Sequence, residues 1–151
     1  HMTTAFPEVR LKQFIEMRGA DGGPWRRLCA LPALWTGLLY ETEALDAAWD
    51  LVKDWTSEEH AMLRAEVPVH ALRTPFRNRT LREVAAEMLE ISSTGLRRRN
   101  RIDWQGSDET GFLGTLYESV DSGMTPAEEM LHKFNGEWGG NVDRLFEEYA
   151  Y

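Results

Sequence analysis

One segment near the start of this chain has the alternating pattern of a β-strand, and it runs from Val9 to Asp21. Successive side chains of a strand point to opposite faces. One face then carries Arg10, Lys12, Phe14, Glu16 and Arg18, and the other carries Val9, Leu11, Ile15 and Met17. No second convincing alternating run follows it. Because a lone strand leaves its backbone donors and acceptors without partners, we expect the chain to be part of something larger, or to self-associate through this strand.

The pair Glu16 and Arg18 on the charged face has two interpretations. A carboxylate beside a guanidinium can present a metal ligand next to a clamp for phosphate or carboxylate. The same pattern is equally typical of a solvated strand face with a cross-strand ion pair. Asp21 can assist such a metal site, although an Asp before two glycines is more typical of a turn or a helix cap. The pattern alone leaves both interpretations of the pair open.

The composition indicates one folded unit over residues 1–151. Of the 151 residues, 42% are hydrophobic and 11% aromatic, which is enough for a single domain with a sizeable core. The chain has 25 acidic and 17 basic residues, and its formal net charge of −8 argues against nucleic acid and anionic membranes as partners. No apolar run approaches the roughly 20 residues that cross a bilayer. A single cysteine fits a reducing compartment, so we expect a cytoplasmic location.

Residues 22–151 have the three- and four-residue periodicity of helices, beginning with Pro24 at a first helical position. A threonine followed three residues later by glutamate, the capping-box pattern, predicts helix starts at Thr56, Thr80 and Thr125. Further helices are predicted from Thr42 (as N-cap) to Trp55, from Asp108 to Val120, and over Val142, Leu145, Phe146 and Tyr149. The segment from Val67 to Arg79 is expected to be irregular. The predicted fold class is mainly α, with one N-terminal strand (residues 1–21) followed by about six or seven helices.

Several side chains outside the strand carry expectations of their own. Arg26 and Arg27 stand in a first helical turn, where the helix dipole disfavours cations, so at least one is expected to have a tertiary partner or an anion. Arg73 and Arg77 either shape the edge of a ligand site or dock against another domain. Cys29 is expected to be a buried structural thiol. Four tryptophans are expected to lie in the core: Trp25, Trp35, Trp49 and Trp55.

The chain resembles a known enzyme family in several runs. The run FPEVRLKQFIEMRGADGGPWRRLCALPALWTGLLY, from Phe6 to Tyr40, closely resembles the C-terminal part of glutamate-cysteine ligases of the plant and proteobacterial type. Similar runs are DAAWDLVKDWT at 46–56, VPVHALRTPFRNRTL at 67–81 and SGMTPAEEMLHKFNGEWGGNVDRLFEEYAY at 122–151. The resemblance covers essentially the whole chain in order.

This resemblance implies an ATP-dependent ligase that joins the γ-carboxylate of glutamate to the amine of cysteine, the first step toward glutathione. In the family, ATP phosphorylates the carboxylate, the amine attacks the acyl phosphate, and the strand belongs to an antiparallel sheet like that of glutamine synthetase. The implied cofactors are Mg²⁺ and ATP. By resemblance, Glu16 takes the metal role and Arg18 the catalytic, phosphate-binding role. Arg10 and Lys12 can reach nucleotide or substrate from the same face, or extend into solvent.

The family's catalytic region is much longer than this chain. Glu16 and Arg18 alone do not supply the several oxygen ligands that Mg²⁺ requires. The first hypothesis is therefore a C-terminal ligase portion that is inactive without the N-terminal catalytic region or a complementary chain, with glutamate, cysteine and ATP as its small-molecule partners. The alternative is a stand-alone, non-catalytic helical module derived from that ligase and kept for binding or regulation.

Overall fold

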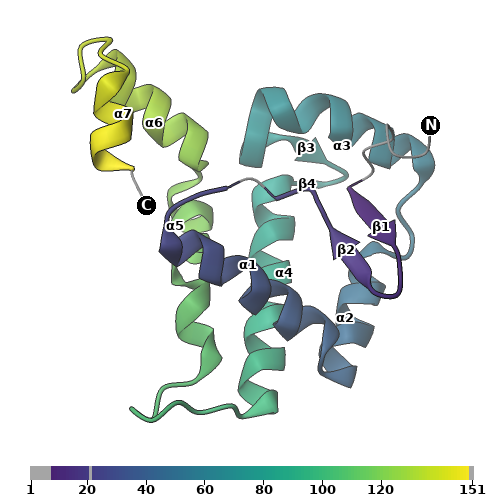
Figure 1. Ribbon diagram of the computed structural model, residues 1–151. Helices are drawn as coiled ribbons and strands as arrows, with labels where there is room; N and C mark the ends of the chain where they lie inside the picture. The colour runs from purple at the N-terminus through teal and green to yellow at the C-terminus, as the bar shows by residue number, and fades with distance from the viewer. Residues whose placement is uncertain (1–7, 21, 150–151) are drawn as a thin grey trace.

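The computed structural model describes residues 8–20 and 22–149, and helices dominate them (Figure 1). The predicted mainly α fold with six or seven helices is confirmed, since these residues form seven α-helices. They are α1 Trp25–Leu39, α2 Thr42–Val52, α3 Ser57–His70, α4 Leu81–Arg99, α5 Gly114–Ser122, α6 Pro126–Asn135 and α7 Asp143–Glu148. Asp21 lies outside the described residues. Within the described ranges, no helix is both long and apolar enough to cross a membrane.

The N-terminal segment is an antiparallel hairpin, and the prediction of one continuous strand is wrong. Strand β1, Val9–Leu11, pairs with strand β2, Ile15–Met17. The turn over residues 12–14 contains a hydrogen bond of 2.9 Å from the Lys12 N–H to the Phe14 carbonyl. Arg10 lies opposite Glu16 in the register, so these two even-numbered residues still share one face. The period-two pattern is thus the same for a single strand and for this hairpin. The strand is paired within the chain, and self-association stays a prediction.

The capping-box prediction is confirmed at three helix starts. Thr56, Thr80 and Thr125 are the N-caps of α3, α4 and α6. At each start, the glutamate three residues later accepts the backbone N–H of the threonine, at 2.8, 2.7 and 2.9 Å respectively. These bonds satisfy backbone donors that the helix itself leaves unpaired.

Three other helix starts differ from the prediction. The N-cap of α2 is Glu41 and not Thr42, because the Glu41 carboxylate accepts the N–H groups of Glu43 and Ala44. Pro24 is likewise the N-cap of α1 and not its first helical residue. A carboxylate that reaches the first-turn N–H groups serves the same purpose as the shorter side chains that usually define caps. The helix predicted from Asp108 also begins differently, as the 3₁₀ helix η3 at Glu109–Leu113, before α5.

The segment between α3 and α4 is more regular than expected. Helix α3 continues past Pro68 to His70 and is followed by the 3₁₀ helix η2 at Ala71–Arg73. A second small hairpin follows, in which β3, Pro75–Phe76, pairs with β4, Arg79–Thr80. Phe76 is almost fully buried, with its ring 4.8 Å from the ring of Trp55 in an edge-on arrangement. The segment predicted as irregular is therefore packed against the start of α3.

The core lies where α1 crosses α4. Gly37 of α1 meets Gly95 of α4 so closely that a Cβ on Gly95 would lie 2.0 Å from the Gly37 carbonyl oxygen. The Ser92 hydroxyl donates to the Leu34 carbonyl at 2.9 Å, which satisfies a buried polar group within this crossing. The apolar cluster beside it consists of Ala33, Leu96 and Leu113, packed against Leu34, Leu116 and Tyr117. Helices α6 and α7 stand on the α5 side, away from the hairpin β1–β2 (Figure 1).

Candidate functional site

The charged face of the hairpin β1–β2 is where the sequence places the candidate site. Arg10 Nε donates to Glu16 Oε2 at 2.7 Å across the two strands, and the two side chains are 36% and 30% exposed. The Arg18 N–H donates to the Glu8 carbonyl at 2.7 Å, which continues the pairing beyond β2. The structure thus brings Arg10, Glu16 and Arg18 to one half-buried face. The predicted cross-strand ion pair is confirmed.

The electrostatics of this face favour an ionised Glu16. The hydrogen bond from Arg10 is the main cause that holds the Glu16 pKa below its usual value, and the charges of Arg10, Lys12 and Arg18 add to it against partial burial. Glu16 is therefore a carboxylate near neutral pH and can only accept hydrogen bonds or bind cations. The charges of three cationic side chains therefore act on this one carboxylate.

Lys12 is placed differently from the other cations. It lies in the turn between the strands rather than on a continuous strand, and its ammonium is 5.8 Å from the centre of the Phe14 ring. Its long side chain still influences the pKa of Glu16 through its charge. The predicted shared face therefore holds for Arg10, Glu16 and Arg18, while Lys12 contributes from the tip of the hairpin.

The hairpin is fixed to the helices on one side and bare on the other. Arg64 of α3 donates through Nη2 to both carboxylate oxygens of Glu8, at 2.7 and 2.8 Å. The apolar face carries Val9, Leu11 and Ile15, all exposed, with Leu11 82% exposed. An apolar sheet face left in solvent is unusual and is typical of a surface that packs against further polypeptide. Sequence reasoning missed the Arg64 contact, because it joins residues 56 positions apart with no local pattern.

The described residues do not form a complete metal site. Across residues 8–20 and 22–149, no group of three or more His, Cys, Asp or Glu side chains is arranged to hold a metal ion. Glu16 supplies one carboxylate, and Mg²⁺ requires near-octahedral coordination by several oxygen atoms. The described part of the chain alone therefore does not fit a magnesium site.

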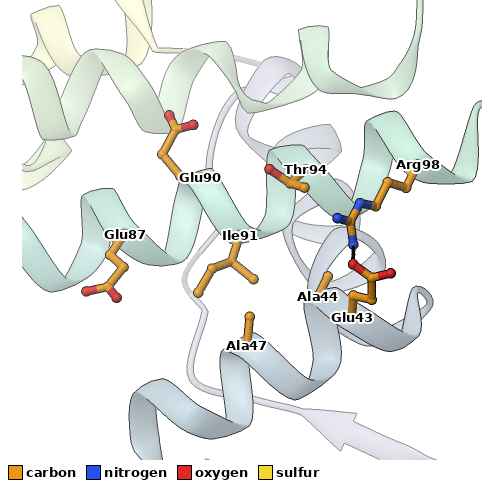
Figure 2. A pocket seen from close by; sticks show the side chains of 8 residues that line it. All are labelled: Glu43, Ala44, Ala47, Glu87, Glu90, Ile91, Thr94 and Arg98. Carbon is orange, nitrogen blue, oxygen red and sulfur yellow. Dashed lines mark hydrogen bonds and ion pairs between the residues drawn. The ribbon is translucent and has the colours of Figure 1, made fainter.

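A hollow of about 400 Å³ lies between α2 and α4 (Figure 2). Its carboxylates already have partners within the chain. Glu43 binds Arg98, Glu87 binds Arg79 at 2.5 Å, and Glu90, which points away from α2, accepts from the Tyr117 hydroxyl at 2.8 Å. The carboxylates that line the hollow are already paired, and the lining also includes alanine and isoleucine side chains. The hollow therefore indicates imperfect packing between two helices rather than a ligand site.

The other arginines that the sequence singled out also have partners within the chain. Arg26 pairs with a glutamate of α5 at 2.9 Å and Arg27 with one of α6 at 3.5 Å, which confirms the predicted tertiary partner. Arg73 pairs with Glu128 at 2.6 Å, and Arg77 donates to both carboxylate oxygens of Glu59. Both arginines of the 73–77 loop are therefore paired within this fold, and their expected role at a ligand site or at a docking surface stays a prediction.

The comparison with protein families decides the relationship. The family model described as glutamate-cysteine ligase family 2 (GCS2) matches residues 1–148. The chain belongs to this family. A relative named glutamate–cysteine ligase, chloroplastic, from Arabidopsis thaliana is 56% identical over all 151 residues. Relatives of the same name from Brassica juncea and Nicotiana tabacum are 54% and 52% identical over the same length.

The chain covers only part of these family members. It is matched over 100% of its own length but spans 28% of each of the three relatives. Most of the polypeptide of such a ligase therefore lies outside the matched segment. The predicted position of this chain at the C-terminal end of the family enzyme stays a prediction, as do the roles of Glu16 and Arg18.

The names of the family relatives correct the expected location. All three are named chloroplastic, which points to a plastid rather than the cytoplasm. The expectation of a cytoplasmic protein rested on one cysteine, and a single thiol does not distinguish one reducing compartment from another.

Proposed function

We propose that this chain is one portion of an ATP-dependent glutamate–cysteine ligase. The proposed reaction transfers the γ-phosphoryl group of ATP to the γ-carboxylate of glutamate and releases ADP. The amine of cysteine then attacks the acyl carbon and phosphate leaves, so that an amide bond replaces the acyl phosphate. The observation that carries the proposal is the family match over residues 1–148, together with ligase relatives at 52–56% identity over the whole chain.

The proposed site is the charged face of the hairpin β1–β2. We assign Arg18 to the phosphoryl group in transfer, where a guanidinium offsets the charge of crowded anions. Arg10 and Lys12 contact the nucleotide or the substrate from the same end of the hairpin. The action of all three cationic side chains on Glu16 supports these assignments. The exposed apolar face of the hairpin supports an assembly in which further ligase polypeptide covers it.

Glu16 is proposed as one ligand of a magnesium ion. Its lowered pKa keeps it ionised, and Arg10 occupies Oε2, so we assign Oε1 to the metal. Magnesium would supply charge neutralisation between the phosphate groups. The remaining ligands are expected from the part of the ligase outside this chain, since the described residues do not provide them.

Turnover by a complete ligase tests the residue assignments. We would replace the matching segment of the Arabidopsis ligase with this chain and measure ADP release that depends on glutamate and cysteine. Arg18→Ala and Glu16→Gln are expected to lower turnover at least 100-fold, because the first removes the cation assigned to the phosphoryl group and the second removes the charge of the proposed metal ligand. Arg144→Ala, which removes an exposed ion pair on α7, is the matched control and leaves turnover within twofold. Unchanged turnover in the Arg18 and Glu16 variants would overturn the assignments.

The alternative function, a non-catalytic binding or regulatory module, has one observation in its favour. The Arg10–Glu16 and Arg64–Glu8 pairs satisfy much of the hairpin's charge within the chain, as a purely structural hairpin would. Under this alternative, the complete ligase carrying this chain folds but has no turnover, and the chain alone binds a specific protein partner.

A further inference from the structure

A second hollow lies between the first turns of α1 and the corner where η3 meets α5. It has a volume of about 380 Å³, and its lining includes Trp25, Cys29, Gly111, Phe112 and Thr115. It is separate from the charged face of the hairpin, since α1 extends away from the hairpin toward α5 at this end (Figure 1). The ligase chemistry proposed above does not use this hollow, which we call the α1–α5 hollow.

The walls of the α1–α5 hollow are large apolar side chains left in solvent. Trp25 is 76% exposed and Phe112 is 54% exposed, and Leu28 beside them is also exposed. The expectation that Trp25 lies in the core is therefore wrong, and Cys29 is only half-buried rather than buried. Exposed aromatic rings around a concavity are typical of a surface that binds another polypeptide.

Nothing within the described chain fills this space. A Cβ on Gly111 or on Gly114 would meet no heavy atom within 4 Å, and neither glycine has a positive φ. The rim is polar, because Arg26 of α1 and Glu118 of α5 form an ion pair of 2.9 Å across it. An apolar centre inside a polar rim is the usual anatomy of a protein–protein contact.

We propose that the α1–α5 hollow receives an aliphatic or aromatic side chain from the part of the ligase polypeptide that lies outside this chain. The inference rests on the proposed function. The chain spans 28% of its ligase relatives, so most of their polypeptide is available as the occupant. Residues 18–24 connect β2 to α1, so the exposed apolar face of the hairpin and the hollow belong to consecutive elements of the chain. A contact here would fix the helices relative to the catalytic hairpin.

Two variants test this contact by their effects on the thermal unfolding of the isolated chain and of the complete ligase. Gly111→Leu adds a large apolar side chain at a residue that lines the hollow, and Trp25→Ser removes another lining side chain. In the isolated 151-residue chain, both are expected to change the midpoint of thermal unfolding by less than about 2 °C, because the side chain added at position 111 would enter open space and Trp25 is largely exposed. In the complete ligase carrying this chain, both are expected to lower the first unfolding midpoint by at least about 5 °C. Trp104→Ser, which alters a 90% exposed tryptophan outside the hollow, is the matched control and is neutral in both settings.

The results separate this inference from the proposed function. If each variant shifts the midpoint of thermal unfolding by the same amount in the isolated chain and in the complete ligase, the proposed contact is overturned. This holds whatever the turnover of the complete ligase. Loss of turnover with the expected shifts intact would instead overturn the proposed function alone. The inference would also be overturned if a second copy of the chain occupied the hollow. Sedimentation would then detect a dimer of the chain, and Gly111→Leu would dissociate that dimer. If Gly111→Leu does not fold, Trp25→Ser decides the outcome.

Discussion

At the scale of single residues, the main surprise is that several charges singled out by the sequence are paired within the chain. Glu16 was open to two interpretations from the sequence, and the structure gives it Arg10 as a partner at 2.7 Å. The alternation of side chains along a strand predicted that Arg10 and Glu16 share that face, because a three-residue turn leaves this alternation unchanged. The long-range partners of Arg64 and Arg77 were not predictable, since no local pattern connects them to their glutamates.

Glu59 provides a prediction about pH at the residue scale. The hydrogen bond from Arg77 and the bond from the Thr56 N–H lower its pKa from an ordinary value of 4.5 to about 2. A carboxyl with a lower pKa in the folded state stabilises the fold above the unfolded pKa. This contribution is present at pH 7 and is lost as the pH falls from about 4.5 toward 2.

Thermal unfolding at pH 7 and at pH 3 measures this effect. The midpoint of Glu59→Gln should fall less between the two values than that of the unaltered chain, because the variant has no carboxyl to protonate. Glu147→Gln, which alters an exposed ion pair with Arg144 on α7, serves as the control. Equal falls for Glu59→Gln and the unaltered chain would contradict the role of the Arg77 bond.

At the scale of elements, helix starts were predictable and strand pairing was not. The capping boxes at Thr56, Thr80 and Thr125 are local, so four consecutive residues contain the whole signal. The hairpin and the small sheet β3–β4 depend on turns whose residues carry no strong turn signature. The close crossing of α1 and α4 was also not apparent, because a glycine in a helix indicates only a weak helix former until its neighbour is known.

Gly95→Ala tests the crossing of α1 and α4. The added Cβ would lie 2.0 Å from the Gly37 carbonyl oxygen, which is backbone and does not rotate away. We expect a loss of about 1–3 kcal/mol in the free energy of unfolding, or more, from overpacking. Gly114→Ala is the matched control, because its Cβ would meet nothing within 4 Å and alanine favours a helix by about 1 kcal/mol. Urea unfolding of both variants gives the comparison, and a stable Gly95→Ala chain would contradict the crossing.

At the scale of the whole molecule, the family relationship was predictable and the surfaces were not. The quoted runs extend along the chain, and the family match covers residues 1–148. Helical periodicity placed Trp25 and Trp49 in the core, but both are exposed. Periodicity identifies which positions share a helix face, and it does not say whether the same chain supplies a neighbour for that face. The bare hairpin face and the α1–α5 hollow are therefore features that only the structure reveals.

The central claim is that this chain serves as one portion of a glutamate–cysteine ligase. The most direct measurement is formation of the glutamate–cysteine amide product by the Arabidopsis ligase in which this chain replaces the segment that is 56% identical to it. The account predicts ATP-dependent product formation within about tenfold of the unaltered plant enzyme, and none from the 151-residue chain alone. A folded replacement ligase that forms no product would contradict it.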